Sequence, residues 1–227
     1  MAGKTVAMIA KQNYEALLMD YAAGTLNEAQ SLIVASHLTL SPFARRIVED
    51  CEAIGGSLLD CQCDPIAMKS DSLADVLDRL ESEQEEKDEP VAHSTCEMLD
   101  SMKLPRPVQN YIHETEYLPW KKVYPGMQSY EIKTKCRNSK VRLLKIDPGT
   151  KTPEHSHAGT EITLMIDGAA HDESGTYSRG DLIVMDERIT HQPVADEKMG
   201  CFCLVVNSDP IRLTGWMGKI LNPFLSR

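Results

Sequence analysis

Apolar residues near the start of the chain recur at the spacing of an amphipathic α-helix. Four of them fall at positions i, i+3, i+4 and i+7: Tyr14, Leu17, Leu18 and Tyr21. Residues at this spacing lie on one face of a helix, and Gly24 supplies a stop after them. Thr25 and Glu28 have the spacing of a capping box, which predicts a second helix that continues to about Leu40.

Two further helices are predicted before residue 85. Ser41 followed by Pro42 is typical of an N-cap and a first helical turn, and the apolar side that follows is expected to end at Gly55 and Gly56. A fourth helix begins near Asp71 or Ser72, and its apolar stripe consists of Leu73, Val76, Leu77 and Leu80. These stripes predict a small helical bundle. The fourth stripe, which a loop separates from the others, can equally lie on a partner.

One segment in the second half of the chain has the pattern of a turn followed by a β-strand. Residues 177–181 have the composition of a turn, and the apolar run 182–185 follows directly. A chain of 227 residues is longer than one minimal barrel, so two domains are expected. We predict an α+β protein with a helical bundle at 1–85, an acidic and polar linker at 86–103, and a second domain with β-strands at 104–227.

Three histidines and one glutamate in the second half have the spacing of a metal site. His155 and His157 are two residues apart, so on a strand both side chains point to the same face. Glu161 follows four residues later and stays on that face if the strand resumes, whereas His191 must come from another strand. One such histidine alone is usually structural, but the set together suits a divalent metal. We expect zinc, with iron, manganese or nickel as alternatives.

The cysteines form two Cys-x-Cys pairs. Cys201 and Cys203 lie in an apolar run, where thiols are more often small core residues, and a redox function is the alternative. Cys61 and Cys63 lie in a polar loop. Seven cysteines in a chain that begins without a convincing export signal predict reduced thiols and a cytoplasmic location.

Charge is distributed unevenly along the chain. Residues 1–90 contain 17 acidic and 7 basic residues, whereas the remainder contains 17 of each. An acidic surface repels phosphates, so direct nucleic-acid binding is disfavoured and a basic protein partner is favoured. No apolar run approaches the about 18 residues of a membrane span.

Two sets of motifs resemble known proteins. The histidine segment, with Gly149, Gly168 and Gly180 around it, resembles the paired motifs of the cupin superfamily, in which a small antiparallel barrel encloses a metal. This resemblance implies an antiparallel β-barrel at 104–227. The segments YAAGTLNEAQSLIVASHLTLSP and EAIGGSLLD, followed by an acidic linker and a cupin, resemble the ChrR-type anti-sigma factors. This resemblance implies a helical domain that binds an extracytoplasmic-function sigma factor, and a cupin that tunes the response to singlet oxygen or peroxides.

The resemblance also implies a zinc ion in the helical domain, held by a His-x3-Cys-x2-Cys motif and an upstream histidine. This sequence departs from that motif, because His37 is followed by Ser41 and Ala44, and residues 11–13 contain no histidine. We therefore expect no N-terminal zinc, and we interpret His37 as the remainder of a degenerate site, packed between helices or on the surface.

Two other functions stay open at this point. Three histidines and a glutamate leave open positions on an octahedral ion, so a metalloenzyme of the dioxygenase or isomerase type is the first alternative. The second is a cupin that binds a small molecule and keeps the helices for dimerisation, which makes a homodimer an open question. The sequence offers no visible acid, base or substrate clamp, so an enzyme is the less favoured interpretation.

Overall fold

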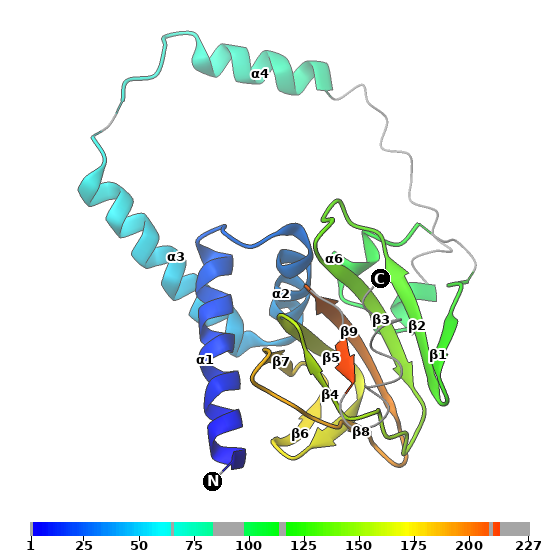
Figure 1. Ribbon diagram of the computed structural model, residues 1–227. Helices are drawn as coiled ribbons and strands as arrows, with labels where there is room; N and C mark the ends of the chain where they lie inside the picture. The colour runs from blue at the N-terminus through cyan, green and yellow to red at the C-terminus, as the bar shows by residue number, and fades with distance from the viewer. Residues whose placement is uncertain (1, 65, 84–97, 114–116, 209–210, 214–227) are drawn as a thin grey trace.

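The computed structural model describes residues 2–64, 66–83, 98–113, 117–208 and 211–213, and it confirms the α+β architecture (Figure 1). Helices come first in the chain: α1 (Ala2–Ala22), α2 (Glu28–Leu40), α3 (Pro42–Gln62), α4 (Ser72–Glu83) and the short α6 (Arg106–Gln109). Strands follow: β1 (Lys121–Tyr124), β2 (Met127–Ile132), β3 (Lys140–Ile146), β4 (His155–His157), β5 (Glu161–Asp172), β6 (Gly175–Ser178), β7 (Leu182–Met185), β8 (Val194–Ala195), β9 (Cys201–Asn207) and β10 (Ile211–Leu213).

The start of α2 corrects the predicted capping box. Asn27 is the N-cap: its side chain accepts from the backbone N–H of Gln30 at 3.0 Å, and the Gln30 side chain accepts from the backbone N–H of Asn27 at 3.3 Å. The box predicted from Thr25 is therefore wrong, and the Thr25 hydroxyl donates to the carbonyl of Asp20 instead. The turn after α1, with Gly24 at φ 69°, delays the helix start until Asn27, and asparagine caps at least as well as threonine.

The third helix begins as predicted but does not end at the two glycines. Ser41 is the N-cap and its hydroxyl accepts from the backbone N–H of Ala44 at 3.2 Å. The predicted end at Gly55 and Gly56 is wrong, because α3 continues to Gln62. A glycine ends a helix when it adopts a positive φ beyond the last turn, and neither of these glycines does so.

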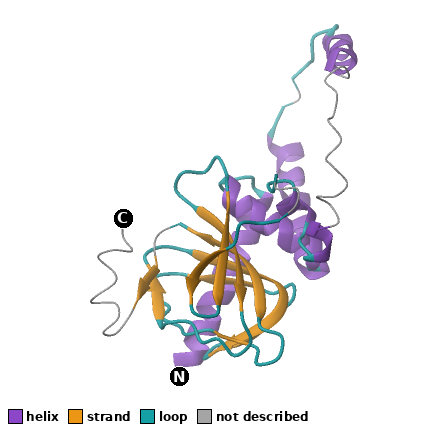
Figure 2. Ribbon diagram, turned by 90° about the vertical axis from the view of Figure 1, so that its right-hand side faces the viewer, coloured by secondary structure: helices purple, strands orange, loops and turns teal. Residues whose placement is uncertain are grey.

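An antiparallel sheet forms the second half of the chain. Its strand order is β1-β2-β3-β9-β5-β6, with β7 and β8 also paired to β5, and β4 pairs separately with β10. Figure 2 shows the strands wrapped around a common interior, with helices along one side. Strand β5 is the centre of this arrangement because it pairs with β6, β7, β8 and β9.

The helices and the sheet share one hydrophobic core. Helix α1 contacts β7, and α2 contacts both β5 and β9. Ile33 of α2 and Leu164 of β5 are fully buried in the same cluster. Met165, the next residue of β5, belongs instead to a second cluster with Cys201 and Cys203. Because successive strand residues point to opposite faces, β5 is the wall between the helices and the interior of the barrel.

The predicted linker is described only at its end, since residues 86–97 lie outside the described part of the chain. Leu99 and Leu104 are 2% and 5% exposed and belong to the large core cluster. Lys103 forms an ion pair with Asp167 at 2.8 Å. Leu99 and Leu104 therefore belong to the core, and Lys103 connects the end of the predicted linker to β5.

Helix α4 is separate from this core. Figure 1 shows α4 and the second half of α3 projecting away from the sheet. None of the helices that the structure describes combines the length and hydropathy needed to span a membrane.

Candidate metal centre

Two strands and one bridge bring the four predicted ligands together. His155 and His157 are the two ends of β4, and both side chains are buried while Ser156 between them is only half-buried. Glu161 is the first residue of β5, after a turn of three residues. His191 pairs with His155 through two reciprocal backbone hydrogen bonds of 3.1 Å. The ligand atoms of these four residues all lie within 4.8 Å of one another.

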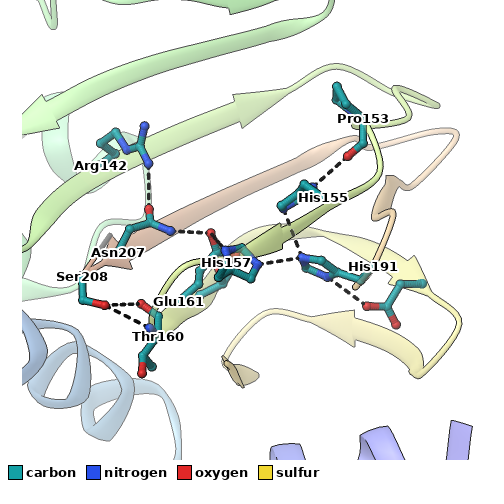
Figure 3. Close-up of polar contacts among 11 residues, drawn as sticks. Arg142, Pro153, His155, His157, Thr160, Glu161, His191, Asn207 and Ser208 are labelled. Atoms are coloured by element: carbon teal, nitrogen blue, oxygen red, sulfur yellow. Dashed lines mark hydrogen bonds and ion pairs between the residues drawn. The ribbon is translucent and has the colours of Figure 1, made fainter. Parts of the chain in front are cut away.

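Hydrogen bonds outside this cluster orient two of the imidazoles (Figure 3). His155 Nδ1 lies 2.8 Å from the carbonyl of Pro153, and His191 Nδ1 lies 3.4 Å from Asp172 Oδ2. A carbonyl and a carboxylate only accept, so Nδ1 carries the proton in both rings and Nε2 keeps its lone pair.

The Nε2 lone pairs of His155 and His191 point at one another, which is the main sign of a cation site. His191 Nε2 lies 3.2 Å from the Nε2 atoms of both His155 and His157. Two lone pairs at this distance repel each other unless a proton or a metal lies between them. Two nitrogen ligands bound at about 2.0–2.1 Å in a tetrahedral arrangement are themselves about 3.3 Å apart. The residues present therefore fit a zinc-sized ion.

The electrostatics of the site keep its ligands in the metal-binding form. Burial lowers the pKa of His157 to about 4, and burial together with the neighbouring His191 lowers the pKa of His155. Burial alone would raise the pKa of Glu161, but the three imidazoles and the Asn207 amide shift it downward overall. At neutral pH His155 and His157 are therefore neutral and the Glu161 carboxylate is charged, as metal binding requires.

Three residues near the site were not predicted: Asp172, Asn207 and Arg142. Asp172 orients His191, and the Asn207 amide donates to Glu161 Oε2 at 2.6 Å. The sequence offers one signal for Asn207: it lies an even number of residues after Cys201 and Cys203 on β9, so its side chain shares their face of the strand. Which residue lies opposite it depends on the strand register, and the sequence does not state the register.

The two thiols of β9 lie inside the barrel in the second hydrophobic cluster. Cys201 and Cys203 are 6% and 4% exposed. The hydrogen bond with Cys201 and burial both raise the pKa of Cys203 well above its usual value. A protonated thiol is a poor nucleophile, so Cys203 behaves as a small apolar residue unless Cys201 reacts first. A redox function of this pair stays a prediction.

His37 of α2 is packed between helices. It is 3% exposed, and its Nε2 lies 3.0 Å from the hydroxyl of Tyr14 on α1. Ser41 caps α3 and Ala44 is fully buried, so neither supplies a metal ligand. Among the described residues, the cluster around His155 is the one group of three or more metal-ligating side chains.

The fold and the site together define a cupin-type barrel with a candidate metal site, attached to an N-terminal helical unit. Residues 108–210 match the model of the ChrR cupin-like domain. The anti-sigma-E factor ChrR of Cereibacter sphaeroides is 34% identical over 211 residues, which are 92% of this chain and 95% of that protein. The chain therefore belongs to the ChrR family.

A solved structure supports the same relationship. In the crystal structure of Rhodobacter sphaeroides SigE in complex with the anti-sigma ChrR, the matching chain is 33% identical to this one, with a TM-score of 0.69. The match covers 85% of this chain and 96% of that chain. It therefore includes the helical unit as well as the cupin.

Proposed function

We propose that this protein is an anti-sigma factor that sequesters an extracytoplasmic-function sigma factor and responds to oxidative stress through its cupin metal centre. Its membership of the ChrR family supports this function, since the relative of known structure was solved bound to SigE. The observation in this chain that carries the proposal is the apolar stripe of α4. The proposal locates the protein in the cytoplasm, where sigma factors meet RNA polymerase.

The α4 stripe is exposed along its whole length. Its four residues are exposed by 69%, 52%, 51% and 53%: Leu73, Val76, Leu77 and Leu80. A helix of 12 residues is marginal in water when nothing covers its apolar face. Complete burial of one such side chain gains about 1.5–3 kcal/mol, so covering the exposed halves of all four gains about 3–6 kcal/mol.

The second half of α3 presents a similar surface. Ile54, Leu58 and Leu59 are 62%, 53% and 62% exposed. Both segments project from the sheet in Figure 1. The α3 and α4 surfaces together can contact one partner from two sides, which is the helix-in-groove mode of recognition.

The charge of α4 indicates the kind of partner. Asp75 and Asp78 lie on the polar side of the helix, and both are exposed. A basic protein surface complements this side and speeds association, whereas nucleic-acid phosphates are repelled. We therefore propose no direct contact with nucleic acid.

The first experiment is co-expression with an extracytoplasmic-function sigma factor from the same organism, followed by size-exclusion chromatography. We expect a stoichiometric complex. The double variant Leu73→Ala/Leu77→Ala should weaken the complex by about 10- to 100-fold. About half of each leucine side chain is exposed in the free protein, and the variant loses the free energy gained when the partner buries that half. Asp75→Asn, on the opposite side of α4, is the matched control: it removes one charge but no apolar contact, so it should slow association slightly and leave the affinity nearly unchanged.

Two results would contradict the sigma-binding function. One is the absence of a complex when both proteins are folded, and the metal centre would then have to be assayed as an enzyme. The other is equal binding by the double leucine variant and by Asp75→Asn. The same chromatography of the chain alone tests the homodimer.

We further propose zinc as the resident metal, held by His155, His157, Glu161 and His191. Zinc has no redox chemistry and would supply a fixed charge that holds these ligands together. The double variant His155→Ala/His157→Ala should lose the metal, keep sigma binding, and no longer release the sigma factor on exposure to singlet oxygen. Retention of the metal by this variant would contradict the ligand assignment.

The proposed functions follow the predicted domains. Residues 1–85 bind the sigma factor, residues 86–103 are the linker, and residues 104–227 respond to the oxidant. Helix α2 lies against β5, whose first residue is the ligand Glu161. A change at the metal centre therefore has a short path to the helices. Release requires a second conformation with lower affinity for the sigma factor, and the ligand change must favour it.

A further inference from the structure

Three neighbouring strands place a row of polar side chains inside the barrel, beside the metal centre. In the sheet, β9 lies between β3 and β5. Asn207 at the end of β9 is directly opposite Glu161 of β5. Arg142 of β3 is opposite Val205, two residues before Asn207 on the same face. The register thus lines up Arg142, Asn207 and Glu161 across adjacent strands.

These three side chains form a continuous chain of hydrogen bonds (Figure 3). Arg142 Nη2 donates to Asn207 Oδ1 at 2.7 Å, and Asn207 Nδ2 donates to Glu161 Oε2 at 2.6 Å. A guanidinium only donates and a carboxylate only accepts, so the Asn207 amide has one permitted orientation between them. Asn207 is 4% exposed, so water hardly competes for these bonds.

We propose that Arg142 and Asn207 are positioning residues that hold the Glu161 carboxylate in its metal-binding orientation. The other oxygen of Glu161 accepts from Thr163 Oγ1 at 3.3 Å, so the carboxylate is held at both oxygens. Each oxygen still has a free lone pair for a metal. Partners of this kind fix the direction of the ligand before the metal arrives.

The amide between the two charges has a physical reason. A direct ion pair between Arg142 and Glu161 would compete with a divalent cation for the same carboxylate. Asn207 is neutral and lies between the two charged groups. It is oriented by the guanidinium and in turn orients the carboxylate, and it keeps the positive charge of Arg142 away from Glu161. The carboxylate therefore stays available to the metal.

The cost of this arrangement to the fold supports a role at the site. Arg142 Nε is buried and has no hydrogen-bond partner in the described part of the chain. A buried donor without a partner destabilises a protein, and an apolar side chain of similar length would avoid that loss. An arginine kept at this position is therefore explained better by the ligand it orients than by stability.

The test measures the affinity of the full-length protein for Co²⁺, whose visible absorption reports the ligands around the ion. We expect Arg142→Met and Asn207→Ala each to weaken Co²⁺ binding by about 10- to 100-fold, as is usual for residues that orient metal ligands. The absorption bands should also change, because Glu161 is no longer held. Lys140→Met is the matched control, since Lys140 is exposed on the same strand and face and carries the same charge.

A double-variant cycle distinguishes positioning from general effects. If Arg142 acts through Asn207, adding Arg142→Met to Asn207→Ala should weaken binding no further. The thermal midpoint of the metal-free Arg142→Met protein should be unchanged or higher, which a purely structural arginine would not give. Arg142→Lys keeps one donor and should recover part of the affinity, and it carries the test if Arg142→Met does not fold.

Several outcomes would overturn the inference. These are unchanged affinity and spectrum in Arg142→Met, additive losses in the double variant, or an equal loss in Lys140→Met, which would indicate long-range charge alone. Failure of the unmodified protein to bind Co²⁺ would overturn the metal assignment itself and this inference with it. The sigma-binding experiment does not depend on either result.

Discussion

Acid should destabilise the metal-free protein through His157 in particular. Burial lowers the pKa of this imidazole from 6.5 to about 4 in the folded state. Protons therefore bind more tightly to His157 in the unfolded chain than in the folded protein. Above pH 6.5 the imidazole is neutral in both states, and its titration costs no folding stability. As the pH falls from 6.5 to about 4, the unfolded chain takes up the proton first, and the free energy of unfolding decreases.

The magnitude follows from the size of the shift. A difference of one pKa unit corresponds to about 1.4 kcal/mol, so His157 alone should account for about 3 kcal/mol of the free energy of unfolding. The pKa of His155 is shifted in the same direction and adds to the loss. A total stability of about 5–15 kcal/mol is typical of domains, so this is a large fraction.

Urea unfolding of the chelator-treated protein at pH 7 and at pH 4 measures this loss. The matched variant is His157→Gln, which keeps a polar side chain but does not titrate. Groups that do not interact with His157 titrate alike in both proteins, so the difference between the two pH dependences reports His157 together with Glu161, whose pKa His157 lowers. Equal losses of stability in the two proteins would refute the linkage argument, and so would a loss confined to pH values below about 4.

Three further predictions test the fold. Ile33→Ala should lower the free energy of unfolding in urea by about 2–5 kcal/mol. Because Ile33 lies in the core shared with the sheet, the unfolding transitions seen by helical circular dichroism and by tryptophan fluorescence should shift together. Separate transitions would contradict a shared core. Asn27→Ala should cost about 1 kcal/mol of thermal stability, whereas Thr25→Ala should cost clearly less if Asn27 is the cap. Gly168→Ala should lower the free energy of unfolding by at least about 2 kcal/mol, because Gly168 has φ 70° and a Cβ there would collide with the carbonyl of Gly200. Unchanged stability would contradict this geometry.

Features that depend on neighbours along the chain could be read from the sequence. The His155 and His157 pair was predictable because alternation on a strand is a local property. The same holds for the first turn of α3, where Ser41 and Pro42 act within four residues. Glu161 could be predicted as a ligand because the turn before β5 contains three residues, and this spacing returns the carboxylate to the same face as the two histidines.

Local signals failed where two of them competed. Thr25 and Asn27 both suit a helix start, and the turn at Gly24 decides between them. Gly55 and Gly56 suit a helix end only if they adopt a positive φ, and here they continue the helix at a modest cost. In each case the three-dimensional path of the chain, rather than the residue type, selected the outcome.

The sequence by itself determined the class of fold, the four candidate ligands and the apolar stripe of α4, because residue spacing alone decides which side chains share a face. Only the tertiary structure decided that α2 and β5 share a core and that Arg142 and Asn207 reach Glu161. These relations depend on strand register and helix packing between segments far apart in the chain. Many registers satisfy the same alternation of apolar and polar residues, and the packing of the whole molecule selects one of them.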